Sequence, residues 1–303
     1  MTTRARRDLL GPVGLVLGGI LSVQVGAAIA KGLFGEISPT AMVWLRLATS
    51  AVVLGAVVRP RMRGRTRQDW LVVVGFGASL ATMNWAIYQS FSRIPLGIAV
   101  TIEFIGPLTL AVLGSRRVRD LLWVLLAGVG VAFLGFQRTG LDPAGVLYAL
   151  LAGAAWAAYI LLSASTGRRW EGFDGLAVAS IVAAFAMTLP ALVTAGTSLW
   201  DGRILLIGAL VGLLSSVIPY SCELVALRSL RPAVFGILMS LEPAAAALAA
   251  IVVLQEHLSP VQWLAIACVV AASIGATRSG AGPGEPPGHL DDERSTAPGT
   301  LAT

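Results

Sequence analysis

The chain has 303 residues, of which 56% are hydrophobic and only 13% are charged, and its mean hydropathy is +0.81. Soluble domains contain about 25% charged residues, so this composition excludes an ordinary water-soluble fold. The net charge is +6, but the arginines lie in short clusters between apolar runs and form no basic patch interleaved with aromatic residues. The charge therefore indicates membrane topology, and no nucleic-acid partner is expected.

Ten apolar runs follow one another along the chain, each long enough to cross a hydrocarbon core of about 30 Å as a helix. Because the runs are continuously apolar and do not alternate with polar residues, they predict helices and not the strands of a barrel. We therefore expect an all-α polytopic membrane protein. The predicted spans are residues 11–33, 39–58, 69–91, 95–114, 120–137, 142–163, 174–195, 203–226, 231–253 and 260–277.

The positions of the basic residues orient these spans. With the N-terminus inside, 17 of the 22 Lys and Arg residues fall on the inner side and four on the outer side, as the positive-inside rule requires. Residues 1–10 then form a basic cytoplasmic segment, and both termini are predicted to be cytoplasmic. Residues 279–303 are rich in Gly, Pro and acidic residues, which predicts a disordered cytoplasmic tail.

The two halves of the chain resemble each other weakly. A shift of 136 residues places Pro107 on Pro243, and a carboxylate, Glu103 or Glu242, precedes the proline in each half. Five spans per half is an odd number, so residues 11–138 and 142–278 are predicted to be two inverted five-helix repeats. Many secondary transporters have this arrangement, with the substrate site between the repeats near the midplane. The alternative is a chance match between generic apolar helices.

Several charged and polar side chains fall inside predicted spans, where a charge costs at least about 2.5–3.5 kcal/mol. A carboxyl group removed from water binds a proton more readily, so a membrane-buried glutamate can exchange protons near neutral pH. These side chains are the candidates for substrate binding and proton coupling. They are Glu103, Arg46, Glu242, Gln24, Asn84, Tyr220, Glu223 and Lys31.

Structural alternatives stay open for these residues. Glu103 and Arg46 could form a structural ion pair, Glu242 could compensate for the helix break at Pro243, and Glu223 is close enough to the inner surface to reach solvent. The long Lys31 side chain could extend to the lipid headgroups.

Four segments carry a resemblance to a known family: SVQVGAAIAKGLF (22–34), MNWAIYQSFSRIPLGIAVTIEFIGPL (83–108), SSVIPYSCELVALRSL (215–230) and FGILMSLEPAAAALAAIVVLQEHLSP (235–260). Over about residues 11–277 the chain resembles the EamA branch of the drug/metabolite transporter superfamily, and within it the inner-membrane threonine/homoserine exporters. The resemblance implies the EamA fold, a location in the bacterial cytoplasmic membrane, and export of threonine- or homoserine-like amino acids by proton antiport. The candidates that match its motifs are Gln24, Lys31, Asn84, Glu103, Tyr220, Glu223 and Glu242.

A zwitterionic substrate needs a carboxylate for its ammonium group and a cation or a helix N-terminus for its carboxylate, and Glu103 with Arg46 could supply both. The alternative is efflux of another small metabolite or a cationic drug. No HExxH, Walker A or nucleophile-elbow motif occurs, so we expect neither an enzyme nor a metal or cofactor, and the proton gradient is the expected energy source. A homodimer is left open.

Overall fold

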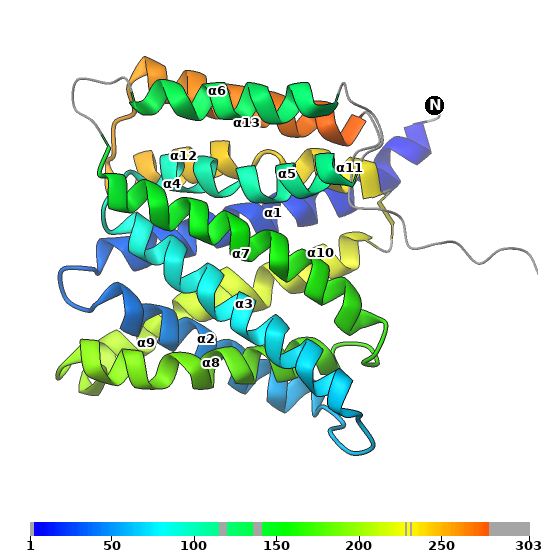
Figure 1. Ribbon diagram of the computed structural model, residues 1–303, viewed down its shortest axis with the longest axis vertical. Coiled ribbons are helices and arrows are strands. Elements are labelled where there is room, and N and C mark those ends of the chain that lie inside the picture. Colours follow the sequence, from blue (N-terminus) through cyan, green and yellow to red (C-terminus); the bar gives the residue numbers. More distant parts are fainter. Residues whose placement is uncertain (1–2, 115–119, 136–140, 228, 231, 279–303) are drawn as a thin grey trace, which may run out of the picture.

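The computed structural model describes residues 3–114, 120–135, 141–227, 229–230 and 232–278, and that part is helical, with no strand (Figure 1). Side chains are described for 11–114, 120–132, 141–219, 221–222, 225–226, 229–230 and 234–278. The α-helices are α1 (Thr3–Gly32), α2 (Pro39–Val58), α3 (Arg67–Phe91), α4 (Leu96–Glu103), α5 (Ile105–Leu113), α6 (Leu121–Gly135), α7 (Pro143–Gly167), α8 (Asp174–Ala195), α9 (Gly202–Gly212), α10 (Ile218–Leu227), α11 (Pro232–Met239), α12 (Glu242–Leu254) and α13 (Pro260–Arg278). A short 3₁₀ turn, Ser198–Trp200, precedes α9, and a π-turn, Leu213–Val217, joins α9 to α10.

Eight of the described helical segments are long and apolar enough to cross a membrane, and two shorter apolar segments, Leu121–Ala132 and Gly202–Val217, complete the ten predicted spans. The prediction of an all-α polytopic membrane protein with ten spans is therefore confirmed. Three spans are divided: the fourth into α4 and α5, the eighth into α9 and α10, and the ninth into α11 and α12.

Prolines explain the breaks in the fourth and ninth spans. A proline has no N–H group, so the carbonyl four residues before it loses its helical donor. Pro107 removes the donor for Glu103, where α4 ends, and Pro243 removes the donor for Met239, where α11 ends. The same local chemistry thus interrupts the chain at matching places in the two halves.

The packing of the helices relates the halves to each other. Helices α2 and α8, α4 and α12, and α6 and α13 pack against each other, while α1 packs on α10 and α3 on α7. These are the pairs that a two-fold relation between two five-span halves would produce. The first helices of the halves, α1 and α7, run in opposite directions across the bundle (Figure 1), as an inverted repeat requires. The repeat limits, 11–138 and 142–278, and the cytoplasmic segment 1–10 stay predictions, and the tail 279–303 lies outside the described residues.

Ion pairs tie the halves together at both ends of the bundle. At one end, which we name the Lys31 end, Lys31 Nζ lies 2.6 Å from Glu256 Oε1. At the opposite end, which we name the Arg65 end, Arg65 lies 3.7 Å from Asp174. Each pair joins a residue of the first half to one of the second. The Arg65 end carries the arginine-rich loop 59–66, so it is the end that the arginine distribution predicts to be cytoplasmic.

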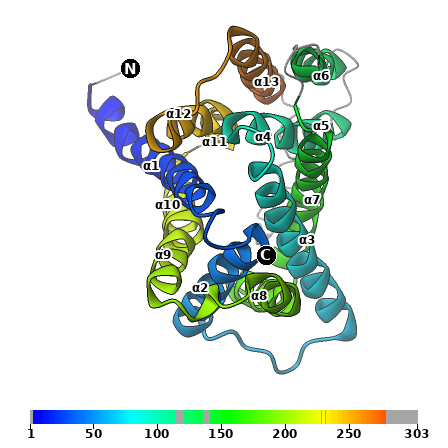
Figure 2. The same cartoon turned by 90° about the vertical axis from the view of Figure 1, so that its left-hand side faces the viewer.

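Seen along the bundle, most helices form a ring, and α6 and α13 lie outside it on one side (Figure 2). Small residues allow the ring helices to approach closely, as is usual where membrane helices pack. A Cβ added at Gly97 would lie 2.8 Å from the backbone of Ala247, and one at Gly106 would overlap the carbonyl of Gly153. These contacts hold α4 against α12 and α5 against α7, and so fix the position of the break between α4 and α5.

Candidate functional site

Arg46 lies within the bundle, seven residues after α2 begins at Pro39, or about 10 Å from the Lys31 end. Its side chain is only 9% exposed. Nη2 donates to the carbonyl of Ser215 at 2.9 Å, and Nε donates to Ser216 Oγ at 3.5 Å. The guanidinium carbon lies 5.7 Å from the centroid of the Tyr88 ring. The remaining N–H groups of the guanidinium have no hydrogen bond to a residue that the structure describes, so Arg46 keeps donors for an anion.

The Ser215 carbonyl can accept this bond because of the local sequence. In a regular helix its donor would be the amide four residues later, but Pro219 stands there and has no N–H group. The chain forms a π-turn at this point, in which Ile218 N–H donates to the carbonyl of Leu213. Arg46 supplies the donor that the proline removes, since a buried carbonyl requires a partner. The eighth span thereby positions the guanidinium.

Glu103 is the last residue of α4, seven residues after Leu96, so it lies at about the same depth as Arg46. Its side chain is 8% exposed. The charge of Arg46 acts on the Glu103 carboxylate, but among the described residues no hydrogen bond or ion pair within 4.0 Å engages that carboxylate. Two buried groups of opposite charge therefore lie at one depth without direct contact, and the structural ion pair considered from the sequence is not formed.

Three residues close to Arg46 in the fold carry buried hydroxyl groups without a described partner. The Tyr88 side chain is 0% exposed, and its hydroxyl has no hydrogen-bond partner among the described residues. The same holds for Ser50 Oγ, one helical turn beyond Arg46 on the same face of α2. Ser215 Oγ is also without a partner and points towards Gly26 of α1. Residues with unpartnered hydroxyls thus lie on α2 one turn from Arg46, on α3 with a ring beside the guanidinium, and on the π-turn that accepts from it.

The other candidates lie elsewhere. Lys31 pairs with Glu256 at the Lys31 end and donates to the carbonyl of Ile94 at 2.8 Å, so protein groups engage its ammonium. Glu256 Oε2 also accepts from the amide of Leu96, the first residue of α4, at 3.0 Å. Lys31 therefore ties α1, α4 and the end of α12 together, and it does not face Arg46.

Gln24 and Asn84 are both buried. Gln24 Oε1 has no partner among the described residues, but Gln24 lies on the side of α1 opposite Ser22, whose hydroxyl donates to the π-turn. Asn84 Nδ2 donates to the carbonyl of Leu80 in its own helix at 2.8 Å. The structure thus buries Gln24 with no hydrogen bond to Arg46 among the described residues, and the Asn84 amide is bonded within α3.

Glu242 is the buried first residue of α12. A carboxylate in the first turn of a helix is stabilised by the free N–H groups there. Tyr220 and Glu223 belong to α10, but their side chains lie outside the described residues.

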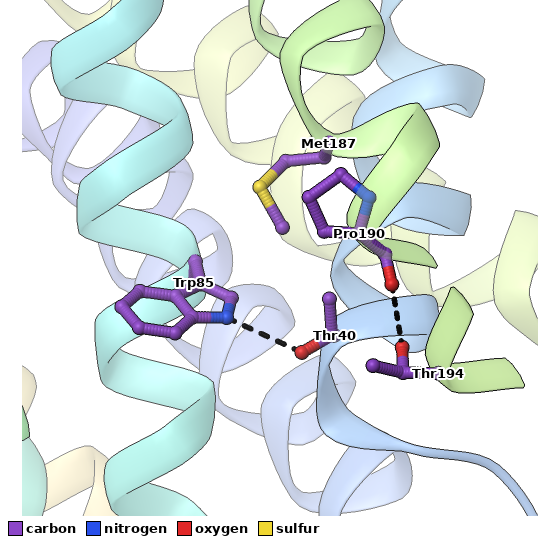
Figure 3. Close-up of a pocket in the computed structure, with 5 residues that line it drawn as sticks. All are labelled: Thr40, Trp85, Met187, Pro190 and Thr194. Atoms are coloured by element: carbon purple, nitrogen blue, oxygen red, sulfur yellow. Dashed lines mark hydrogen bonds between the residues drawn. The ribbon is translucent and has the colours of Figure 1, made fainter. Parts of the chain in front are cut away.

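A separate pocket of about 320 Å³ lies nearer the Lys31 end, between α2, α3 and α8 (Figure 3). It is lined by Thr40, Trp85, Met187, Pro190 and Thr194. Thr40 Oγ1 accepts from Trp85 Nε1 at 3.2 Å, and Thr194 Oγ1 donates to the Pro190 carbonyl at 2.8 Å. None of these five residues is charged and their hydroxyls are already bonded, so this pocket does not suit a zwitterion.

Comparison with known proteins decides the family. The profile of the EamA-like transporter family matches residues 143–278. The threonine/homoserine exporter RhtA of Escherichia coli (strain K12) is 39% identical over 269 residues, which cover 88% of this chain and 91% of that exporter. The chain belongs to the EamA-like transporter family. The RhtA exporter of Salmonella typhimurium (strain LT2) is 40% identical with the same coverage. A crystal structure with 20% identity has the same fold, with a TM-score of 0.61 over 88% of this chain and 97% of that one.

Family membership makes the chain a multi-pass membrane transporter, and the structure then distinguishes among the predicted site residues. It brings Arg46 and Glu103 to one depth and leaves Lys31 at the end of the bundle. The sequence did not single out Tyr88, Ser50 or Ser215. One of them was accessible from the sequence, since a proline four residues after Ser215 marks a carbonyl without a helical donor.

Proposed function

We propose that this family member exports small amino acids of the threonine and homoserine type from the cytoplasm in exchange for protons. The curated relatives that carry this name match 88% of the chain. The observation that carries the proposal is the pair of buried opposite charges at one depth, Arg46 on α2 and Glu103 at the end of α4. An α-amino acid presents one group for each charge, and both contacts are charge-assisted hydrogen bonds, which are the strong kind.

This arrangement gives a physical basis for exchange. The substrate ammonium binds the ionised Glu103 carboxylate, while the substrate carboxylate binds Arg46. A proton that neutralises Glu103 removes the partner of the ammonium and so weakens substrate binding. Because amino acid and proton compete for one carboxylate, the carrier can return loaded with one or the other, which is the requirement for antiport.

We further propose that the Arg65 end faces the cytoplasm of a bacterial cell and that the chain resides in the inner membrane with both termini cytoplasmic. The proton gradient supplies the energy, and no bound cofactor or catalytic step is needed. Assembly as a homodimer is part of the same proposal.

The test is efflux from bacterial cells that lack their own threonine exporters and are loaded with a threonine-containing dipeptide. Cells that express this protein should release threonine and homoserine faster than cells with an empty vector. In proteoliposomes, an imposed proton gradient should drive threonine against its concentration. The panel includes other amino acids and a lipophilic cationic drug. Transport of the drug without any amino acid would overturn the proposal in favour of drug efflux.

Glu36→Gln provides a control for these assays. Glu36 pairs with Arg203 at the Lys31 end through exposed side chains, far from Arg46. Removal of this negative charge should leave both the rate of efflux and its dependence on the proton gradient unchanged, so that a loss of transport in an interior glutamate variant can be assigned to its position.

A further inference from the structure

The Tyr88 hydroxyl is difficult to explain by packing alone. The Tyr88 ring lies among aromatic neighbours, with centroids 6.0 Å from Phe34 and 5.5 Å from Phe91. Phenylalanine would make the same ring contacts and the same cation–π contact with Arg46. The hydroxyl is completely buried and has no partner among the described residues, a condition that costs about 1–3 kcal/mol. A purely structural residue here would be more stable without its oxygen.

The position of the Tyr88 ring next to Arg46 indicates what its hydroxyl can bind. Side chains in a helix lean towards its N-terminus. Tyr88 lies near the C-terminal end of α3, at the Lys31 end, so its side chain leans towards the middle of the bundle. Helix α2 runs in the opposite direction, so the Arg46 side chain leans towards the Lys31 end and therefore towards Tyr88. The Tyr88 ring therefore lies beside the guanidinium, as the distance of 5.7 Å shows. A small ligand whose carboxylate binds Arg46 would bring its side chain within reach of this ring edge.

Ser50 adds a second buried hydroxyl on the same face of α2 as Arg46. It is one turn further along α2, buried, and also without a hydrogen-bond partner among the described residues. Hydroxyl groups both donate and accept, so Tyr88 and Ser50 can each bond a ligand hydroxyl in either direction. No apolar ligand could satisfy them.

We infer that Tyr88 and Ser50 are specificity-determining residues that bind the side-chain hydroxyl of a substrate whose carboxylate is held by Arg46. The inference rests on the proposed function, and it adds a reason why hydroxylated amino acids are selected. A site that contains hydrogen-bonding groups for a substrate hydroxyl discriminates against the analogue without it, because the buried groups are then left unpaired. For both threonine and homoserine that analogue is 2-aminobutyrate.

The test compares these three amino acids in counterflow with purified protein in proteoliposomes. Tyr88→Phe keeps the ring and removes only the oxygen. It should weaken the apparent affinity for threonine or homoserine about fivefold, the effect of losing one neutral hydrogen bond, while the affinity for 2-aminobutyrate stays unchanged or improves. Ser50→Ala should change the selectivity in the same direction by a smaller factor.

Tyr148→Phe is the matched control, because Tyr148 also lies under an arginine, with the guanidinium carbon of Arg93 4.9 Å from its ring centroid, but near the Lys31 end. It should leave all three affinities unchanged. An equal loss for all three substrates in Tyr88→Phe, or no loss for any, would overturn the inference and leave the exporter proposal standing. If the unaltered protein transports none of the three, the proposed function itself fails, and the inference fails with it.

Discussion

The fourth and ninth spans occupy the same place in the two halves of the bundle, and their geometry is the same. Adding 136 to the limits of α4, Leu96–Glu103, gives 232–239, the limits of α11. Each helix ends four residues before a proline, so in each the last carbonyl loses its helical donor. Helix α4 packs on α12 of the opposite half. The backbone of the site is therefore built on a symmetric plan.

The side chains at these breaks differ. The residue at the end of α4 is Glu103, whereas the residue at the end of α11 is Met239. Glu242 is not the counterpart of Glu103, although both precede a proline. It corresponds to Gly106 and begins α12, where the helix N-terminus stabilises a carboxylate. The match between the two carboxylates that the sequence suggested is therefore not a match between equivalent positions.

Arg46 shows the same asymmetry. The position 136 residues later is Val182, so Arg46 and Glu103 both belong to the first half. The second half contributes instead the π-turn and its Ser215 carbonyl, which accepts from Arg46, whereas α3, the counterpart of α9 and α10, is continuous. The comparison shows how a duplicated scaffold can hold an asymmetric ligand: the first half supplies Arg46 and Glu103, and the second supplies the backbone carbonyl that positions Arg46.

The largest effect is expected from Glu103→Gln, because it removes the carboxylate that ends α4 at the same depth as Arg46. The amide keeps the size of the side chain but cannot release a proton, so threonine-driven proton movement in proteoliposomes should fall more than about tenfold, as for loss of a hydrogen bond to a charged group. Glu242→Gln is the comparison and should reduce proton movement much less. Unchanged coupling in Glu103→Gln would show that this carboxylate is structural.

Moving the carboxylate from one break to the other tests whether the two symmetric positions can perform the same role in export. The double variant Glu103→Met with Met239→Glu places the carboxylate at the equivalent break of the second half. We expect it to remain as inactive in export as Glu103→Met alone, because no arginine stands at position 182 to bind the substrate carboxylate. Restored export with correct insertion in the membrane would show that the two breaks are interchangeable.

A third test addresses the packing behind the breaks. A methyl group on Gly106 would overlap the backbone of Gly153, while one on Gly236 of α11 would meet only the side chain of Thr277, at 3.1 Å. Gly106→Ala should therefore lower the free energy of unfolding in detergent by about 2–3 kcal/mol. Gly236→Ala should have little effect, since the helix-forming gain of alanine offsets a mild contact. Equal melting temperatures for the two variants would contradict this account of the fourth span.

The sequence predicts the scaffold well, because membrane helices are encoded locally. Apolar runs of bilayer length define the ten spans, and prolines mark where the fourth and ninth are divided. The sequence also indicates Arg46 and Glu103, since charges in a span require a reason. Arg46 and Glu103 each lie seven residues after the start of their helix. Once α2 and α4 are known to begin at the same end of the bundle, this count places the two residues at one depth.

The contacts between the halves could not be predicted in this way. The bond from Arg46 to the Ser215 carbonyl joins residues 169 positions apart, and it depends on how α2 docks against the π-turn. The role of Tyr88 depends on the same docking, because an apolar helix contains many aromatic residues and only the packed structure shows which of them lacks a hydrogen-bond partner. Lys31 was open to several interpretations for the same reason, since Glu256 lies in the other half.

The smallest effect is expected where α4 begins. Glu256 accepts from the Leu96 amide and pairs with Lys31, and both side chains of the ion pair are less than one-fifth exposed. A double-mutant cycle with Lys31→Met and Glu256→Gln should give a coupling of about 1 kcal/mol in thermal unfolding, because partial burial reduces solvent screening. The same cycle on the exposed pair of Arg203 and Glu36 should give a value near zero. Equal coupling energies in the two cycles would mean that the ion pair does not hold the start of α4. The position of the fourth span would then be determined by helix packing at Gly97 and Gly106.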